Sequence, residues 1–166
     1  MVILVPALAQ AQPATRIADV KIKVCWIGKT RNPAIQSLTD EYLKRLARYA
    51  EIEGRALRDE AELLSKAAGG GSRTKSTLVL LDGRGKQFSS EELADFLRHY
   101  QERNPLPLLF AIGGADGFSD QARRAAAQML SLGKMTLAHE LARVVLLEQV
   151  YRAFTILQGH PYHIGH

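Results

Sequence analysis

The fold of this chain is decided by the stretch Leu106-Pro107-Leu108-Leu109-Phe110-Ala111-Ile112-Gly113-Gly114. Its unbroken apolar run is typical of a strand covered on both faces, as in a parallel sheet. A second run of this kind, residues 77–81, ends at Asp82-Gly83-Arg84-Gly85-Lys86. Because glycine allows sharp turns, each run is predicted to be a buried strand that ends in a glycine-marked loop.

Helical patterns separate these strands. Apolar residues at three- and four-residue steps predict a helix over residues 33–50, Ser89 and Glu92 form a capping box, and residues 139–158 predict a long helix that Gly159 ends. Weaker patterns predict strands at 20–28, 52–57 and 130–132, and helices at 60–67 and from Ser119 or Asp120 to about Met129. This alternation predicts an α/β domain whose mainly parallel sheet is flanked by helices.

The length of 166 residues suits one domain. Residues 20–166 are expected to form it. Residues 1–19 lack the positive charge that begins a secretory signal, so they are expected to be a disordered extension or the result of a misplaced start codon. The single cysteine, Cys25, lies in an apolar stretch and predicts a buried thiol in a reducing compartment. No apolar segment reaches the ~20 residues of a membrane span. The protein is therefore expected to be soluble and cytoplasmic.

Charge and surface pattern point to partners. Lysine and arginine number 22 against 17 acids, a formal net charge of +5. This surplus favours a polyanion such as RNA, although it is also ordinary for a soluble protein. Residues 141–157 are apolar almost all round, and a second copy of the chain would cover such a helix more easily than one small domain can. The pattern therefore indicates a homodimer.

The two glycine-marked strand ends form a candidate ligand site. Ligands of open α/β sheets bind beyond the carboxyl ends of the strands. The alternative is a pair of tight turns with no ligand. A dinucleotide fingerprint is missing, since Gly113-Gly114-x-x-Gly117 differs from G-x-G-x-x-G, and Gly85-Lys86 lacks the Ser or Thr of a P-loop. A nucleoside without phosphates remains as the ligand class.

The chain ends in His160-Pro161-Tyr162-His163. Metal binding is not expected there, because no cysteine or carboxylate accompanies the histidines. The tail is expected either to be flexible or to dock in order against the pocket. Glu148 and Arg152 stand four residues apart on the preceding helix, where a simple surface ion pair is the alternative to a role in a site.

Several of these motifs together resemble the large-subunit ribosomal RNA methyltransferase H family of SPOUT methyltransferases, over Lys21 to His163. The residues that carry the resemblance are Leu81-Asp82, Ile112-Gly113-Gly114-x-x-Gly117, Leu132-x-Lys134-Met135-Thr136-Leu137-x-His139, Arg143-Val144-x-Leu146-x-Glu148-Gln149-x-Tyr151-Arg152-Ala153 and the terminal His160-Pro161-Tyr162-His163. The C-terminal combination is highly specific to this family.

The resemblance implies a C-terminal trefoil knot, S-adenosylmethionine as methyl donor, a homodimer, and N3 of a pseudouridine in 23S rRNA of the assembled ribosome as the methylated atom. By the family pattern, the cofactor contacts fall on Leu81, Gly113, Leu132, Gly133, Lys134, Met135, Thr136 and Leu137. A SPOUT enzyme that acts on transfer RNA and a non-catalytic RNA-binding dimer are the alternatives.

The tail and the long helix supply the predicted catalytic residues. His163 and Tyr162 are expected to meet a base that has been flipped out of the RNA, while Arg143 and Arg152 stabilise negative charge or phosphate without a metal. The sequence does not decide which group takes the N3 proton. The chain departs from the family in its short, glycine-rich residues 60–72, in the ending Ile164-Gly165-His166 where a basic residue is usual, and in its leader.

Overall fold

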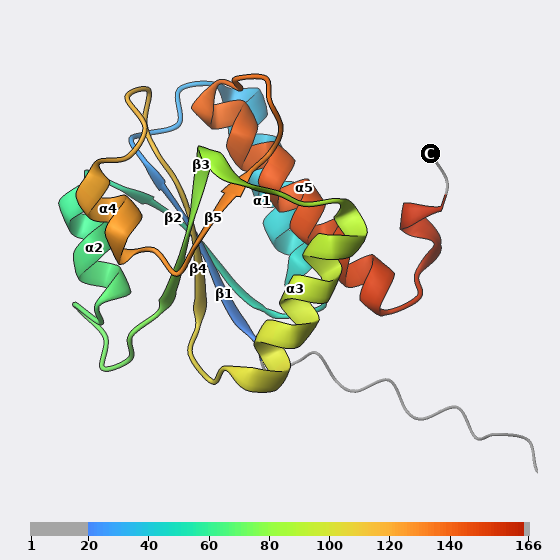
Figure 1. The fold of residues 1–166 in the computed structure, drawn as a ribbon. Helices are drawn as coiled ribbons and strands as arrows, with labels where there is room; N and C mark the ends of the chain where they lie inside the picture. Colours follow the sequence, from blue (N-terminus) through green and yellow to red (C-terminus); the bar gives the residue numbers. More distant parts are fainter. Residues whose placement is uncertain (1–19, 165–166) are drawn as a thin grey trace, which may run out of the picture.

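The fold is a single parallel sheet between two layers of helices (Figure 1). The computed structural model describes residues 20–164, so the predicted extension at residues 1–19 lies outside the described part. The strands are β1 (Lys21–Ile27), β2 (Glu51–Leu57), β3 (Thr77–Gln87), β4 (Leu108–Ile112) and β5 (Gln128–Ser131), in the order β2-β1-β4-β3-β5. The helices are α1 (Pro33–Leu46), α2 (Glu60–Ala67), α3 (Ser90–Arg103), α4 (Asp120–Ala125), α5 (His139–Leu157) and a final 3-10 turn, η2 (Pro161–His163).

The central strand, β4, is buried along its whole length, as its apolar run predicts. It pairs in parallel with β1 on one side and β3 on the other, so that Ile112 stands beside Trp26 and Leu81. α1, α3 and α5 cover one face of the sheet, and α2 and α4 cover the other (Figure 1). The predicted α/β architecture with a mainly parallel sheet is confirmed.

The helix starts follow their sequence signals. The Ser89 Oγ accepts a hydrogen bond from the Glu92 N–H at 3.1 Å, and the Glu92 carboxylate accepts one from the Ser89 N–H at 2.7 Å, which completes the predicted capping box of α3. Asn32 caps α1 in front of Pro33. These caps fix where the helices begin relative to the preceding strand ends.

Four of the predicted boundaries differ from the structure by two residues or more. β3 continues past its glycines to Gln87, because Lys86 and Gln87 pair with Leu130 and Ser131 of β5 after an irregularity in the ladder. Gly85 makes this possible, since an added Cβ would lie 2.5 Å from the backbone of Met129. α4 ends at Ala125 instead of about Met129, and β5 begins at Gln128 instead of Leu130, because this stretch is taken into the sheet. α1 ends at Leu46, short of Ala50.

α5 is the helix that links the sheet to the tail. Leu146, Leu147, Val150, Ala153 and Phe154 are buried in the core between the sheet and the neighbouring helices α1 and α3. Its first turn lies at the carboxyl ends of the strands, and its last turn leads into η2. One end of this helix therefore lies at the carboxyl ends of the strands, and the other end leads to the C-terminal tail.

Candidate functional site

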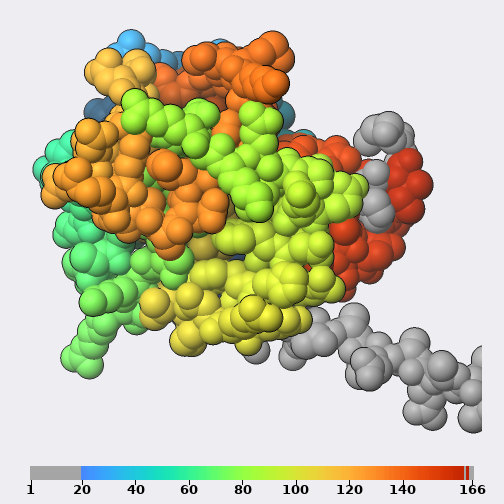
Figure 2. Space-filling view, viewed as in Figure 1, coloured from blue at the N-terminus to red at the C-terminus, as the bar shows by residue number. Residues whose placement is uncertain are grey.

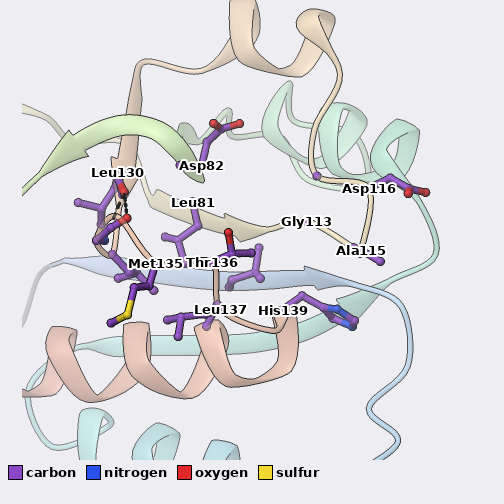
Figure 3. Close-up of a pocket in the computed structure, with 18 of the residues that line it drawn as sticks. Leu81, Asp82, Gly113, Ala115, Asp116, Leu130, Met135, Thr136, Leu137 and His139 are labelled. Atoms are coloured by element: carbon purple, nitrogen blue, oxygen red, sulfur yellow. Dashed lines mark hydrogen bonds between the residues drawn. The ribbon is translucent and has the colours of Figure 1, made fainter.

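A pocket of about 420 Å³ lies beyond the carboxyl ends of β3, β4 and β5. Pockets of this size suit a small organic ligand. Its walls are the two glycine-marked strand ends, the loop after β5 and the first turn of α5 (Figure 3). The lining residues include Leu81, Asp82, Gly83, Ile112, Gly113, Gly114, Asp116, Arg123, Leu130, Leu132, Gly133, Lys134, Met135, Thr136, Leu137 and His139.

The glycine wall is a tight turn. Gly114 and Gly117 form a bridge, and the Gly117 N–H donates to the Gly114 carbonyl at 3.0 Å with Gly117 at φ +69°. A Cβ on the buried Gly113 would lie 3.2 Å from the backbone carbon of Gly117, tighter than an ordinary contact. This loop is therefore a tight turn that also forms one wall of the pocket, and its contact with a ligand stays a prediction.

The loop after β5 forms the opposite wall. Ser131 Oγ donates to the Gly133 carbonyl at 2.9 Å, and Gly133 takes φ +143°. Lys134 to Leu137 are exposed, and the Met135 side chain is 86% exposed. All eight residues predicted from the family pattern to contact the cofactor line this one pocket. The structure thus brings them together, while their contact with a cofactor stays a prediction.

An ion pair that the sequence analysis did not assign forms part of the wall. Arg123 Nε donates to Asp82 Oδ2 at 2.8 Å, and the Arg84 backbone N–H donates to Asp82 Oδ1 at 2.9 Å. Burial raises the pKa of the Asp82 carboxyl, but these two donors outweigh it and hold the pKa below its ordinary value. Asp82 is therefore an ionised acceptor at neutral pH. The position of Asp82 directly after Leu81, at the end of the apolar run, is the sequence signal that could have assigned it to the site.

The tail docks on the second half of α5. The Tyr162 hydroxyl lies 3.2 Å from Glu148 Oε1, and its ring packs edge-on against Tyr151 with centroids 4.8 Å apart. Arg152 Nη2 donates to Glu148 at 2.6 Å while its guanidinium lies 5.0 Å from the centre of the Tyr162 ring. Burial, followed by hydrogen bonding with Tyr42 and the charge of Glu148, raises the pKa of Tyr162. Glu148 and Arg152 are thus more than a surface pair, because they hold the tail.

Within one chain, this docked tail does not meet the pocket, which differs from the expected docking. None of the described side chains of η2 lines the pocket. α5 contributes His139 and Ala142 to it, and Arg152 follows Ala142 by ten residues, about 15 Å along a helix. His163 is the last residue of η2, and its side chain lies outside the described part.

Arg143 also lies apart from the pocket. Its side chain is 1% exposed, and its guanidinium stands 4.2 Å from the centre of the Trp26 ring. Arg143 Nε and Nη2 and the Trp26 Nε1 have no hydrogen-bond partner among the described residues. They border a small cavity, with room for about one water molecule, that shares His139 with the pocket. Burial lowers the pKa of Arg143. Contact between Arg143 and a substrate stays a prediction.

Comparison with known proteins decides the family. A family model described as Predicted SPOUT methyltransferase matches residues 20–163. The chain belongs to the SPOUT methyltransferase family. Its relatives include a protein from Koribacter versatilis that is 56% identical over 147 residues, which cover 89% of this chain and 100% of that protein. A protein from Geobacter sp. (strain M21) is 42% identical, covering 87% and 99%. Both carry the name Ribosomal RNA large subunit methyltransferase H.

Solved structures share the fold of this SPOUT protein. The methyltransferase AviRb from Streptomyces viridochromogenes, in complex with the cofactor AdoMet, matches with a TM-score of 0.52 and 17% identity over 86% of this chain and 62% of that one. A probable methylase family protein from Haemophilus influenzae matches with a TM-score of 0.54 and 14% identity over 88% and 70%. The predicted family and the parallel-sheet fold of SPOUT type are confirmed, and the trefoil knot stays a prediction.

Two further features bear on the surroundings of the site. Burial raises the pKa of Cys25 to about 11, so this thiol is protonated and inert at neutral pH, as its apolar neighbours predict. Among residues 20–164, no helix is long and apolar enough to span a membrane. The same residues hold no cluster of three or more His, Cys, Asp or Glu side chains arranged to bind a metal ion.

Proposed function

We propose that the chain is an S-adenosylmethionine-dependent methyltransferase that methylates N3 of a pseudouridine in the 23S rRNA of the assembled ribosome, in the cytoplasm. Relatives named for large-subunit ribosomal RNA methylation match at up to 56% identity over nearly the whole chain. The single observation that carries the proposal is the pocket at the strand ends, which gathers all eight expected cofactor residues. If the pocket did not bind S-adenosylmethionine, the proposed reaction would be contradicted.

The pocket fits the donor in size and in chemistry. Leu81, Ile112 and Leu130 offer an apolar slot for adenine, and the backbone of residues 132–137 offers hydrogen-bonding groups beside it. An ionised pair, Asp82 with Arg123, stands on the same wall. When bound, the donor supplies a methyl group on a positively charged sulfur. The residues of the chain hold it still and exclude water, so that the acceptor atom attacks in line.

The acceptor side of the site is proposed to come from a second copy of the chain. The described tail is held on its own α5, apart from its own pocket. Exposed apolar side chains, Met135, Leu137 and Leu141, surround the pocket end of α5. In a two-fold dimer, such a surface would be covered by the partner, and each tail would reach the pocket of the other chain.

In that dimer, Tyr162 and His163 are proposed to contact the flipped base, and Arg152 to carry positive charge beside it. As the bond between N3 and the methyl carbon forms, the bond between that carbon and the sulfur of the donor breaks and leaves a neutral thioether. The N3 proton must also leave, and a side chain near the base accelerates this loss. Arg143 packs on Trp26 and supports the start of α5 beside the pocket, and its predicted contact with the RNA would require the buried side chain to move. The trefoil knot is part of the proposal on the strength of family membership.

Mass mapping of nucleosides tests the proposal. Ribosomes and transfer RNA, each lacking the modification, are incubated with the protein and the labelled donor. We expect one methylated pseudouridine in 23S rRNA and none in transfer RNA. Methylation of transfer RNA alone would show that transfer RNA is the substrate instead. Donor binding without methyl transfer to either RNA would favour the non-catalytic RNA-binding dimer.

A further inference from the structure

The pocket wall contains one enclosed pair of opposite charges. The side chain of Asp82 is 7% exposed and that of Arg123 is 20% exposed, whereas Asp116, Lys134 and His139 on the same lining are exposed. Charges in an enclosed, less polar place attract a ligand charge more strongly than solvated ones do. Among the charged residues of the lining, the pair Asp82–Arg123 is therefore expected to attract a charged part of a ligand most strongly.

Both residues of this pair have hydrogen-bond donors or acceptors that no bond within the described chain uses. Arg123 donates from Nε to Asp82 and from Nη1 to Asp120. Within the described chain, these bonds use two of the five N–H groups that a guanidinium carries. Each oxygen of Asp82 accepts one described bond and retains a further lone pair. A bound zwitterion could thus be held by both residues without breaking their mutual contact.

We propose that Asp82 and Arg123 bind the amino-acid end of the methyl donor, Arg123 through its carboxylate and Asp82 through its ammonium group. The inference rests on the proposed function, since it concerns the same ligand. S-adenosylmethionine has one zwitterionic part, and a preformed pair of opposite charges complements it. Adenine and ribose carry no charge, so Arg123 would gain no ionic contact from the ligand if it faced them.

A carboxylate also suits ribose hydroxyls, and the test separates the two arrangements. S-adenosylhomocysteine and 5′-methylthioadenosine are both neutral thioethers with the same adenosine. They differ in the amino-acid end, which only the former has. The ratio of their dissociation constants, measured by calorimetry, therefore reports the amino-acid end alone. For the unmodified protein, we expect S-adenosylhomocysteine to bind about 100-fold more tightly.

Arg123→Gln is the first variant. We expect it to weaken S-adenosylhomocysteine about tenfold or more and 5′-methylthioadenosine less than twofold. Arg124→Gln is the matched control, because it removes an exposed arginine from the same helix that does not line the pocket, and it should change neither constant. Equal losses for both ligands in Arg123→Gln would overturn the proposal and leave the pair as a brace of the pocket.

Asp82→Asn is the second variant, to be used if Arg123→Gln does not fold, because asparagine keeps the shape of the aspartate side chain. It should also weaken S-adenosylhomocysteine selectively, whereas a ribose contact would weaken both ligands alike and overturn the proposal. The decarboxylated analogue 5′-(3-aminopropylthio)adenosine should be insensitive to Arg123→Gln and sensitive to Asp82→Asn. Equal affinity of the unmodified protein for all three ligands would overturn this inference alone. Absence of binding for every adenosine ligand would instead remove the proposed function.

Discussion

The two ends of α5 are built in different ways. At its first turn, main chain and glycines form a pocket that is complete within one chain, with Gly113 and the loop 132–137 as walls. In its second half, the side chains of Glu148 and Arg152 hold Tyr162 of the tail. This difference supports the proposal that one chain forms the donor half of the site by itself, while its tail completes the acceptor half of the site of another copy.

The largest effect is expected at the glycine wall. Gly113→Val would press a branched side chain on the backbone of Gly117, which an added Cβ already approaches to 3.2 Å. The turn would shift and the pocket would lose its shape, so affinity for S-adenosylhomocysteine should fall at least 100-fold by calorimetry. Ala125→Val, on the exposed end of α4, is the control. Unchanged affinity in Gly113→Val would place the donor elsewhere.

The tail should show the opposite behaviour. Because the proposal places His163 against the base, His163→Ala is expected to lower turnover on ribosomes about 100-fold with donor affinity unchanged within twofold. His99→Ala, an exposed histidine of α3, controls for loss of any histidine. Equal turnover in the two variants would take the tail out of the mechanism.

Glu148→Gln should have a smaller effect on turnover. The substitution weakens the charged bonds to Arg152 and Tyr162 that hold η2 on α5. Turnover is expected to fall about tenfold, and the amides of residues 162–164 should exchange hydrogen faster, while donor affinity is retained. Slower turnover without faster exchange would show that Glu148 acts on the substrate directly.

The smallest effect concerns acid stability. Because the folded-state pKa of Asp82 is lowered, its ionised form stabilises the fold above its unfolded pKa, about 3.9, and this contribution is lost as the pH falls through the folded value. The free energy of unfolding, measured with urea, should therefore drop below pH 4 more steeply in the unmodified protein than in Asp82→Asn. Parallel curves would mean that the Arg123 pair adds no stability.

The sequence predicted the pocket end better than the tail end. Continuous apolar runs and glycines mark strands and turns locally, so the wall at Gly113 was visible, and the family motif added residues 132–137. The pair Asp82–Arg123 was missed because its members stand 41 positions apart and meet only through the sheet order. The burial of Arg143 was missed because a helix that is apolar almost all round does not reveal which face meets Trp26.

The position of the C-terminal tail could not be predicted either, because it also depends on contacts between distant segments. The tail motif was recognised in the sequence, but its position depends on which aromatic rings it packs against. Tyr162 packs on Tyr151, which itself contacts Tyr42 and Tyr49 of the α1 region. Such contacts join distant segments through side-chain shape, and no spacing in the sequence encodes them.

A mixing experiment tests most directly whether the site is shared between two chains. Gly113→Val has an intact tail and a blocked pocket, and His163→Ala has the reverse. If each site combines the pocket of one chain with the tail of the other, unfolding and refolding the two inactive variants together should restore about a quarter of unmodified activity, since half of the dimers are mixed and each mixed dimer has one intact site. If the mixture stays as inactive as its components, pocket and tail act within one chain, which contradicts the account.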